Sequence, residues 1–134
     1  SNALTHDVES KIEFLTGSLL EPISDIPEIH GTIDYLVSNP PYISDSEWKA
    51  VAPNVKDYEP TNALRGGSDG LNYIKSLIKL APEYLRIGGQ LIIEIADSQK
   101  DQVLKLAKAN SMLTEPCILN DFESLPRVLV ATRI

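Results

Sequence analysis

Residues 33–42 read Ile33-Asp34-Tyr35-Leu36-Val37-Ser38-Asn39-Pro40-Pro41-Tyr42, a mostly apolar run followed almost at once by two prolines. β-Branched and aromatic residues dominate residues 33–37, which is typical of a β-strand. Proline has no backbone N–H and cannot continue a hydrogen-bonded ladder, so the strand must end before Pro40. The sequence therefore predicts a strand over residues 33–37 that passes directly into a stiff loop.

A helix is expected after residue 70, because apolar side chains recur there every three or four positions. The expected apolar stripe consists of Ile74, Leu77, Ile78, Ala81 and Leu85. Asp69 is the expected amino-terminal cap, and Pro82 is expected to bend the last turn. The Gly88-Gly89 pair is the expected end of this helix.

The rest of the chain alternates between extended and helical patterns. Residues 91–95 form a nearly continuous apolar run, which predicts a parallel strand covered by helices on both faces. A helix is expected from residue 97 or 98 to about residue 110, followed by a closing pair of strands at residues 117–119 and 128–131. A short extended segment is also expected at residues 12–15. Together these patterns predict an α/β fold with a mostly parallel sheet.

Composition limits the possible classes of protein. The 134 residues are 43% hydrophobic, which is enough for one domain with a core. The formal net charge of −7, with no basic cluster, argues against nucleic acid as a partner, because phosphates are usually met by basic patches. No apolar run approaches the roughly 20 residues of a membrane helix, so no membrane association is expected. The single cysteine, Cys117, is expected to be a small buried residue in a reducing compartment.

The start of the chain affects how its domains and location are interpreted. Ser1-Asn2-Ala3 looks like the remnant of a cleaved tag, so residues 4–134 are interpreted as one domain. The expected location is the cytoplasm or the mitochondrial matrix, with any upstream targeting sequence out of view. No metal site is expected, because His6 and His30 have no carboxylate or cysteine at metal-ligand spacing.

The loop at residues 39–42 has the composition needed to bind a planar NH2 group. The side-chain oxygen of Asn39 and the carbonyl of Pro40 can accept its two hydrogens, and Tyr42 offers a flat face for stacking. Such a nitrogen is a poor nucleophile because its lone pair is delocalised. Two acceptors favour a pyramidal nitrogen that can attack an electrophilic methyl group, and positioning would then supply most of the rate. The alternative is a turn that only ends a strand.

The Asn-Pro-Pro-Tyr loop after a hydrophobic strand resembles the signature of methyltransferases that act on the NH2 groups of adenine, cytosine or glutamine. The flanking sequence resembles the HemK/PrmC family of release factor glutamine methyltransferases over about residues 11–133. The segments that carry this resemblance are 38–43, 58–60, 63–64, 66–71, 85–94 and Gln99. The resemblance implies methyl transfer from S-adenosylmethionine to the side-chain amide of the glutamine in the Gly-Gly-Gln motif of a peptide-chain release factor.

The resemblance also implies a fold. The chain would be the carboxy-terminal part of the catalytic domain, with a partial class I S-adenosylmethionine-dependent methyltransferase fold of the Rossmann-like type. The implied sheet order is 3-2-1-4-5-7-6, with a carboxy-terminal antiparallel strand pair. This chain would lack the first and second strands, and the segment near Ile12 would be the third. The implied binding site for the methyl donor is therefore incomplete.

The resemblance assigns roles to individual residues. Asn39 would contact both the methyl donor and the substrate amide, and Pro40, Pro41 and Tyr42 would complete the catalytic amide pocket. Glu59 and Pro60 would shape the substrate entrance. Ser18 and Leu19 stand where the family has an acidic residue and an aromatic residue near the adenine of the donor, so they are the candidate donor contacts outside the loop.

Two other functions stay open from the sequence. The same loop would serve an adenine or cytosine amino methyltransferase acting on nucleic acid, and the chain could also be a catalytically dead protein-binding fragment. A strand at residues 33–37 without its neighbours would expose a hydrophobic edge. Either residues 12–15 cover this edge or two copies form an edge-to-edge homodimer, and the homodimer is the favoured interpretation.

Overall fold

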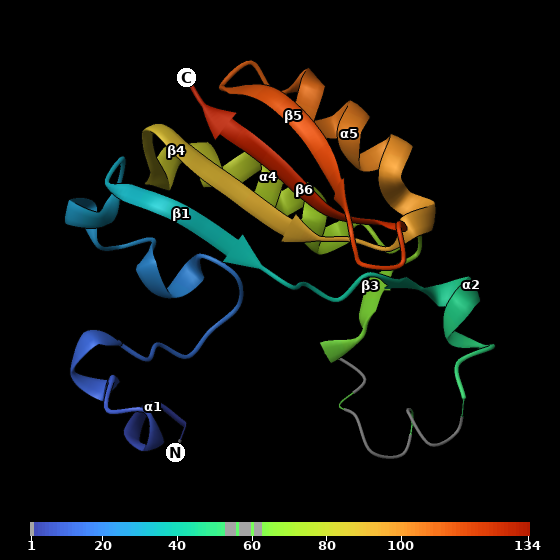
Figure 1. Ribbon diagram of the computed structural model, residues 1–134, viewed down its shortest axis with the longest axis horizontal. Coiled ribbons are helices and arrows are strands. Elements are labelled where there is room, and N and C mark those ends of the chain that lie inside the picture. The colour runs from blue at the N-terminus through green and yellow to red at the C-terminus, as the bar shows by residue number, and fades with distance from the viewer. Residues whose placement is uncertain (1, 53–55, 57–59, 61–62) are drawn as a thin grey trace.

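The computed structural model describes residues 2–52, 56, 60 and 63–134. Its main sheet has the order β1-β4-β6-β5 (Figure 1). The four strands are β1 (Ile33–Ser38), β4 (Leu85–Glu94), β5 (Leu113–Asn120) and β6 (Pro126–Arg133). This order agrees with the 4-5-7-6 part of the order that the resemblance implies.

The α/β class is confirmed, but the expectation of a mostly parallel sheet is wrong for the strands that the structure describes. Strand β1 pairs with β4 in parallel, whereas β4 with β6 and β5 with β6 are antiparallel pairs. The reason lies in the connections. A helix crosses over between β1 and β4, which permits a parallel pair, while the short β5–β6 connection forces an antiparallel hairpin. The expected closing pair of strands is confirmed.

Two helices cover one face of this sheet. Helix α4 (Asn72–Tyr84) contacts β4, helix α5 (Lys100–Ala109) contacts β5 and β6, and the two helices contact each other (Figure 1). The predicted apolar stripe of α4 is buried against the sheet. The core residues with no solvent exposure include Ile74, Ala81, Leu85, Leu91, Ile93, Ile95, Val103, Leu129 and Ala131.

The opposite face of the sheet is uncovered among the described residues. Tyr35 and Val37 of β1 are 64% and 70% exposed, and Leu91 and Ile93 of β4 are fully buried while Ile92 between them is not. The expectation that helices cover β4 on both faces is therefore wrong here. Alternate side chains of a strand point to opposite faces, and both helices lie on one of them.

The carboxyl end of α4 differs from the expectation. The helix ends at Tyr84, Leu85 is already extended, and Pro82 lies in the last turn. Gly88 and Gly89 do not end the helix but belong to an irregular start of β4. Ile33 pairs with Leu85 and Tyr35 with Gln90, so the single residue Asp34 on β1 lies opposite the four residues 86–89 on β4. Gly88 has a φ of +78°, which suits glycine in such a bulge.

Residues 2–32 contain only short helices below β1 in Figure 1. These are α1 (Asn2–Thr5) and the 3-10 turns η1 (Glu9–Lys11), η2 (Glu21–Ile23) and η3 (Pro27–Ile29). The third strand that the resemblance implies near Ile12 is not formed, because residues 12–15 pair with no described strand, and the side chain of Phe14 is 75% exposed. The idea that it covers the β1 edge is also wrong, since β1 ends the sheet with β4 as its one described partner.

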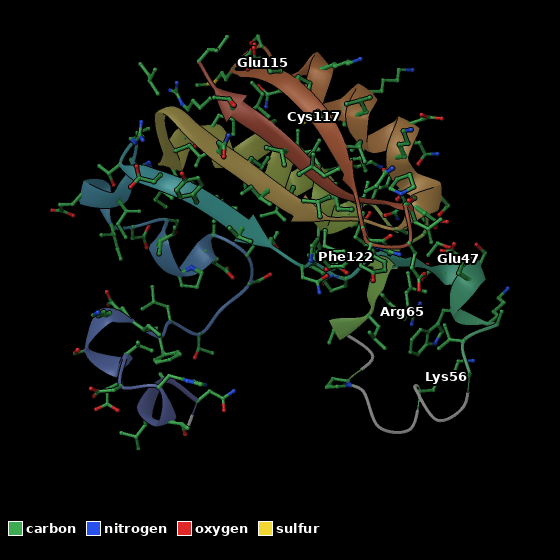
Figure 2. All side chains as sticks on the ribbon, in the orientation of Figure 1. Glu47, Lys56, Arg65, Glu115, Cys117 and Phe122 are labelled. Carbon is green, nitrogen blue, oxygen red and sulfur yellow. The ribbon has the colours of Figure 1, made fainter. Side chains whose placement is uncertain are left out.

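A bulge in β5 overturns the expectation for Cys117, which is exposed. Thr114 pairs with Thr132 and Cys117 with Val130, so two residues on β5, Glu115 and Pro116, lie opposite the single residue Ala131 on β6. Simple alternation from the buried Leu113 would place Cys117 on the covered face. The extra residue moves it to the uncovered face, and Figure 2 labels Cys117 on β5.

The chain after β1 contributes to a second sheet, which has two strands. Strand β2 (Ile43–Ser44) pairs in parallel with β3 (Arg65–Gly67), and helix α2 (Asp45–Trp48) follows β2 directly. The described part of residues 43–68 thus contains two short strands and a short helix. Within the described ranges, no helix combines the length and the apolar character needed to cross a membrane.

Candidate active site

The Asn39–Tyr42 loop leaves the sheet at the carboxyl ends of its parallel strands. Ser38, the last residue of β1, pairs with Ile93 of β4, so the loop begins at the final rung of this pair. In α/β sheets ligands bind outside the carboxyl ends of the strands. The prolines end the hydrogen-bonded pairing of β1 with β4 at the carboxyl ends of these strands, which is where a ligand site is expected.

The loop lines a small pocket of about 120 Å³. Its walls are Asn39, Pro40, Pro41, Tyr42, Ile43, Ala63 and Leu64. The Ile43 N–H donates to the Leu64 carbonyl at 3.0 Å and ties the two walls together. Pockets for complete small-molecule ligands have roughly 300–1,000 Å³, so this one suits a single small group. The four residues predicted for the amide pocket are thus brought together, and Ala63 and Leu64 complete it.

The acceptors predicted in this loop are available. Asn39 is exposed and Pro40 is buried. Within the described part of the chain, no hydrogen bond engages the Asn39 side chain or the Pro40 carbonyl. Both can therefore accept hydrogens from a group that enters the pocket.

Tyr42 connects the pocket to the ends of the neighbouring strands. Its hydroxyl donates to Glu94 Oε1 at 3.4 Å, a long hydrogen bond across from β4. Burial raises the pKa of Tyr42, and the Glu94 carboxylate raises it further, while the charge of Arg127 acts against this shift. The hydroxyl therefore stays protonated at neutral pH. Arg127 is ion-paired with Asp121 at 3.1 Å.

Glu94 and Arg127 were not among the predicted site residues. Glu94 is the last residue of β4, and Arg127 is the second residue of β6. Their positions at the ends of predicted strands were the only feature of the sequence that could have pointed to them. The hairpin between β5 and β6 adds the fully exposed Phe122. Figure 2 labels Phe122 in the connection between β5 and β6.

Helix α2 and strand β3 support the far side of the pocket. Ser44 and Glu47 form a capping box at the start of α2: the Ser44 hydroxyl accepts from the Glu47 N–H, and the Glu47 carboxylate accepts from the Ser44 N–H at 2.9 Å. Arg65 of β3 forms an ion pair with Asp45 at 2.7 Å and lies 5.9 Å from the ring centre of Trp48. Glu47 and Arg65 are labelled together in this region in Figure 2.

The other predicted site residues are placed elsewhere. Ser18 and Leu19 line a separate cavity of about 420 Å³ against α4, with Ser76, Leu80 and Tyr84 among its walls. The structure does not bring them into the pocket of Asn39, and their contact with a methyl donor stays a prediction. Glu59 lies outside the described residues. Pro60 is exposed, and its carbonyl accepts from the Ala63 N–H at 2.8 Å.

Groups of three or more His, Cys, Asp or Glu side chains that could bind a metal ion do not occur in the described ranges. The polar groups around the pocket are thus a carboxamide, backbone carbonyls and the Tyr42–Glu94 pair.

No family model matches the chain. Individual relatives do match. The chain is 42% identical to the release factor glutamine methyltransferase of Geobacter sulfurreducens over 95 residues, which are 71% of this chain and 32% of that protein. It is 35% identical to the release factor glutamine methyltransferase of Synechocystis sp. over 130 residues, which are 97% of this chain and 42% of that protein.

A third relative agrees. The release factor glutamine methyltransferase of Mycolicibacterium smegmatis is 34% identical over 125 residues, which are 93% of this chain and 43% of that protein. The chain thus spans between about a third and somewhat more than two fifths of the length of these three relatives. Over the part that they share, this chain is a relative of the release factor glutamine methyltransferases.

Proposed function

We propose that the protein transfers a methyl group from S-adenosylmethionine to the side-chain amide of a glutamine in the Gly-Gly-Gln motif of a peptide-chain release factor. The observation that carries this proposal is the pocket of about 120 Å³, in which the four residues of the Asn39–Tyr42 loop converge. Its size suits a carboxamide, and its available acceptors are the groups that an NH2 substrate needs.

The chemistry follows from these acceptors. The Asn39 side-chain oxygen and the Pro40 carbonyl would accept the two amide hydrogens and favour a pyramidal nitrogen. The Tyr42 ring would stack against the amide plane. Because its pKa is raised, the Tyr42 hydroxyl would stay neutral and bonded to Glu94 rather than act as a base. Positioning of this kind can contribute roughly 7–11 kcal/mol to lowering a barrier.

The methyl donor, when bound, would supply the electrophilic methyl group from its sulfur. The amide nitrogen would lose one proton to solvent after the attack, so no strong base is needed. Asn39, an exposed residue that lines the pocket, would contact both the donor and the amide. The pocket is too small for a whole donor molecule, and Ser18 and Leu19 lie in a different cavity. The described residues around Asn39 thus form no pocket for the whole donor. The proposed fold is accordingly a partial class I methyltransferase domain.

Nucleic acid is disfavoured as the substrate. The net charge of −7 opposes a polyanion, and the relatives are named for release factors. We retain the cytoplasm or the mitochondrial matrix as the proposed location, because release factors act where translation takes place and an exposed free Cys117 suits a reducing compartment.

The function is tested with the full-length protein, S-adenosylmethionine and a purified release factor. Asn39→Ala removes one of the two amide acceptors and is expected to lower methyl transfer by about 10²–10³-fold, the usual effect of losing a preorganised polar contact. Asn110→Ala is the control. Asn110 is a carboxamide bonded to the Ile78 carbonyl and the Met112 N–H at the opposite end of the sheet, so its loss should affect stability and not the rate.

The substrate is tested with a release factor whose Gly-Gly-Gln glutamine is replaced by alanine, which is expected to accept no methyl group. Near wild-type turnover by Asn39→Ala, or equal methylation of the altered release factor, would contradict the proposed function. Methylation of DNA or RNA with a steep salt dependence would support the nucleic-acid alternative instead.

A further inference from the structure

Gln99 is a buried carboxamide that joins three segments of the chain at the Asn39–Tyr42 loop. It is 6% exposed and ends the 3-10 turn η5 (Asp97–Gln99). Its Nε2 donates to the carbonyls of Tyr42 at 3.0 Å and Gly70 at 3.2 Å. Its Oε1 accepts from the Ala96 N–H at 3.2 Å, just beyond β4. Both hydrogens and the oxygen of this side chain are therefore used.

Backbone contacts hold the same loop from the side of β3. A Cβ atom on Gly70 would lie 2.2 Å from the Tyr42 carbonyl oxygen and 2.6 Å from Gln99 Nε2. A Cβ atom on Gly66 would lie 2.7 Å from the Pro41 carbonyl oxygen. Only glycine permits such close approach, so the backbone at residues 66–70 lies directly against the carbonyls of Pro41 and Tyr42.

The loop needs this external support. Pro40 and Pro41 have no N–H, so neither residue can donate a backbone hydrogen bond that would hold the loop against the sheet. Gln99 instead supplies an N–H donor from outside and fixes the Tyr42 carbonyl. Because the prolines are stiff, fixing one end of the loop also fixes Asn39 and the Pro40 carbonyl relative to the end of β4.

We propose that Gln99 is a positioning residue for methyl transfer. Its carboxamide sets the place of the two amide acceptors and of the Tyr42 ring without contacting the substrate. This inference rests on the proposed function. A misplacement of about 1 Å in such a site can cost on the order of 10²-fold in rate, which is the effect that loss of Gln99 should approach.

The first test is Gln99→Glu in the full-length protein. This side chain has the same size and keeps the acceptor for Ala96, but it places a carboxylate oxygen against two carbonyl oxygens. We expect kcat to fall by about 10–100-fold while KM for the release factor changes much less. Asn110→Asp is the matched control, because it makes the same exchange in a carboxamide that donates to Ile78 at 2.8 Å and accepts from Met112 at 2.9 Å, far from the loop. Its kcat should stay near that of the wild type.

A second pair of variants covers the case in which Gln99→Glu does not fold. Gly70→Ala pushes against the Tyr42 carbonyl, and Gly31→Ala is its control. Both glycines have positive φ, +73° and +69°, but a Cβ on Gly31 meets nothing within 4 Å. The strain of positive φ is therefore common to both variants, and only Gly70→Ala should lower kcat.

Hydrogen exchange gives a readout that does not depend on activity. The Ile43 N–H bonds to Leu64 next to the loop, so its exchange should be faster in Gln99→Glu and Gly70→Ala and unchanged in Asn110→Asp and Gly31→Ala. Unchanged kcat and Ile43 exchange in Gln99→Glu would overturn the proposal, as would an equal loss of kcat in Asn110→Asp. If the wild type methylated no release factor, the proposed function would fail, and the exchange data would still decide whether Gln99 fixes the loop.

Discussion

Tyr42 both lines the pocket and forms hydrogen bonds to the segments around it. Its carbonyl accepts from Gln99, and its hydroxyl reaches Glu94 on the neighbouring strand. The carbonyl bond is 3.0 Å long and the hydroxyl bond 3.4 Å, so the backbone contact is the stronger of the two. The backbone carbonyl of Tyr42 therefore matters more to the site than its hydroxyl.

Tyr42→Phe is expected to keep most of the methyl transfer activity and to lose at most about 1 kcal/mol of stability, because it removes only one long hydrogen bond. The raised pKa of Tyr42 also predicts a pH effect. Above about pH 10 the unfolded tyrosine ionises while the folded one keeps its proton, so wild-type stability should fall as pH rises through the folded pKa. Urea unfolding between pH 8 and 11 tests this, with Tyr42→Phe as the comparison. Equal pH dependence in both proteins would contradict it.

At the scale of elements, the short helix α2 depends on its amino-terminal cap. Four residues are too few for a helix to be stable by itself, and the Ser44–Glu47 capping box satisfies its first N–H groups. The hydrogen bonds from Ser44 to the Glu47 carboxylate lower the pKa of Glu47. Since β2 and α2 follow the pocket directly, this cap also stabilises one of its walls.

Ser44→Ala is expected to lower the free energy of unfolding by about 1 kcal/mol at neutral pH. Glu47 has a lowered folded pKa, so its contribution is present above about pH 4.3 and is lost as pH falls through the folded value. The difference between wild type and Ser44→Ala should therefore shrink in acid. Denaturant unfolding at pH 7 and pH 3 measures it, with the exposed Ser98→Ala as control. A constant difference at both pH values would argue against the capping box.

At the scale of the whole molecule, the uncovered sheet is the dominant feature. Strand β1 has an open edge, and Tyr35 and Val37 lie exposed on the face opposite α4 and α5. Open hydrophobic edges promote pairing with another chain. The 134-residue chain is therefore expected to self-associate, with two β1 edges pairing.

Light scattering should give a mass above that of one chain, rising with concentration. Val37→Lys places a charge on the exposed face of β1 and should shift the chain toward the monomer, whereas Ile87→Lys, at an exposed apolar residue in the bulge of β4, should not. A wild-type chain that stays monomeric over the whole concentration range would refute the edge-to-edge homodimer.

The donor site is also a property of the whole molecule. The pocket at Asn39 has about 120 Å³, and the predicted adenine contacts Ser18 and Leu19 lie in another cavity. These 134 residues alone are therefore expected to bind S-adenosylmethionine weakly or not at all. Calorimetry with the 134-residue chain and with the full-length protein tests this expectation. Micromolar binding by the shorter chain would contradict it.

Local sequence determined the elements and the pocket loop. Alternation and helical spacing are properties of neighbouring residues, and they predicted β1, α4, α5 and the closing hairpin. The prolines determined where β1 ends, and they thereby determined that Asn39 and Tyr42 lie at the carboxyl ends of the parallel strands. These features follow from the geometry of a few adjacent residues, so no knowledge of the chain path was needed.

Only the tertiary structure decided which distant groups meet. The Gln99–Tyr42 and Tyr42–Glu94 bonds join residues 57 and 52 positions apart, and such contacts depend on the path of the whole chain. The third strand that the resemblance implies near Ile12 does not form, because an extended segment needs a hydrogen-bonded partner and none of the described strands pairs with residues 12–15. Cys117 is exposed because one extra residue in β5 changes the face of every side chain after it, a shift set by pairing with β6 and not by the residues of β5 alone.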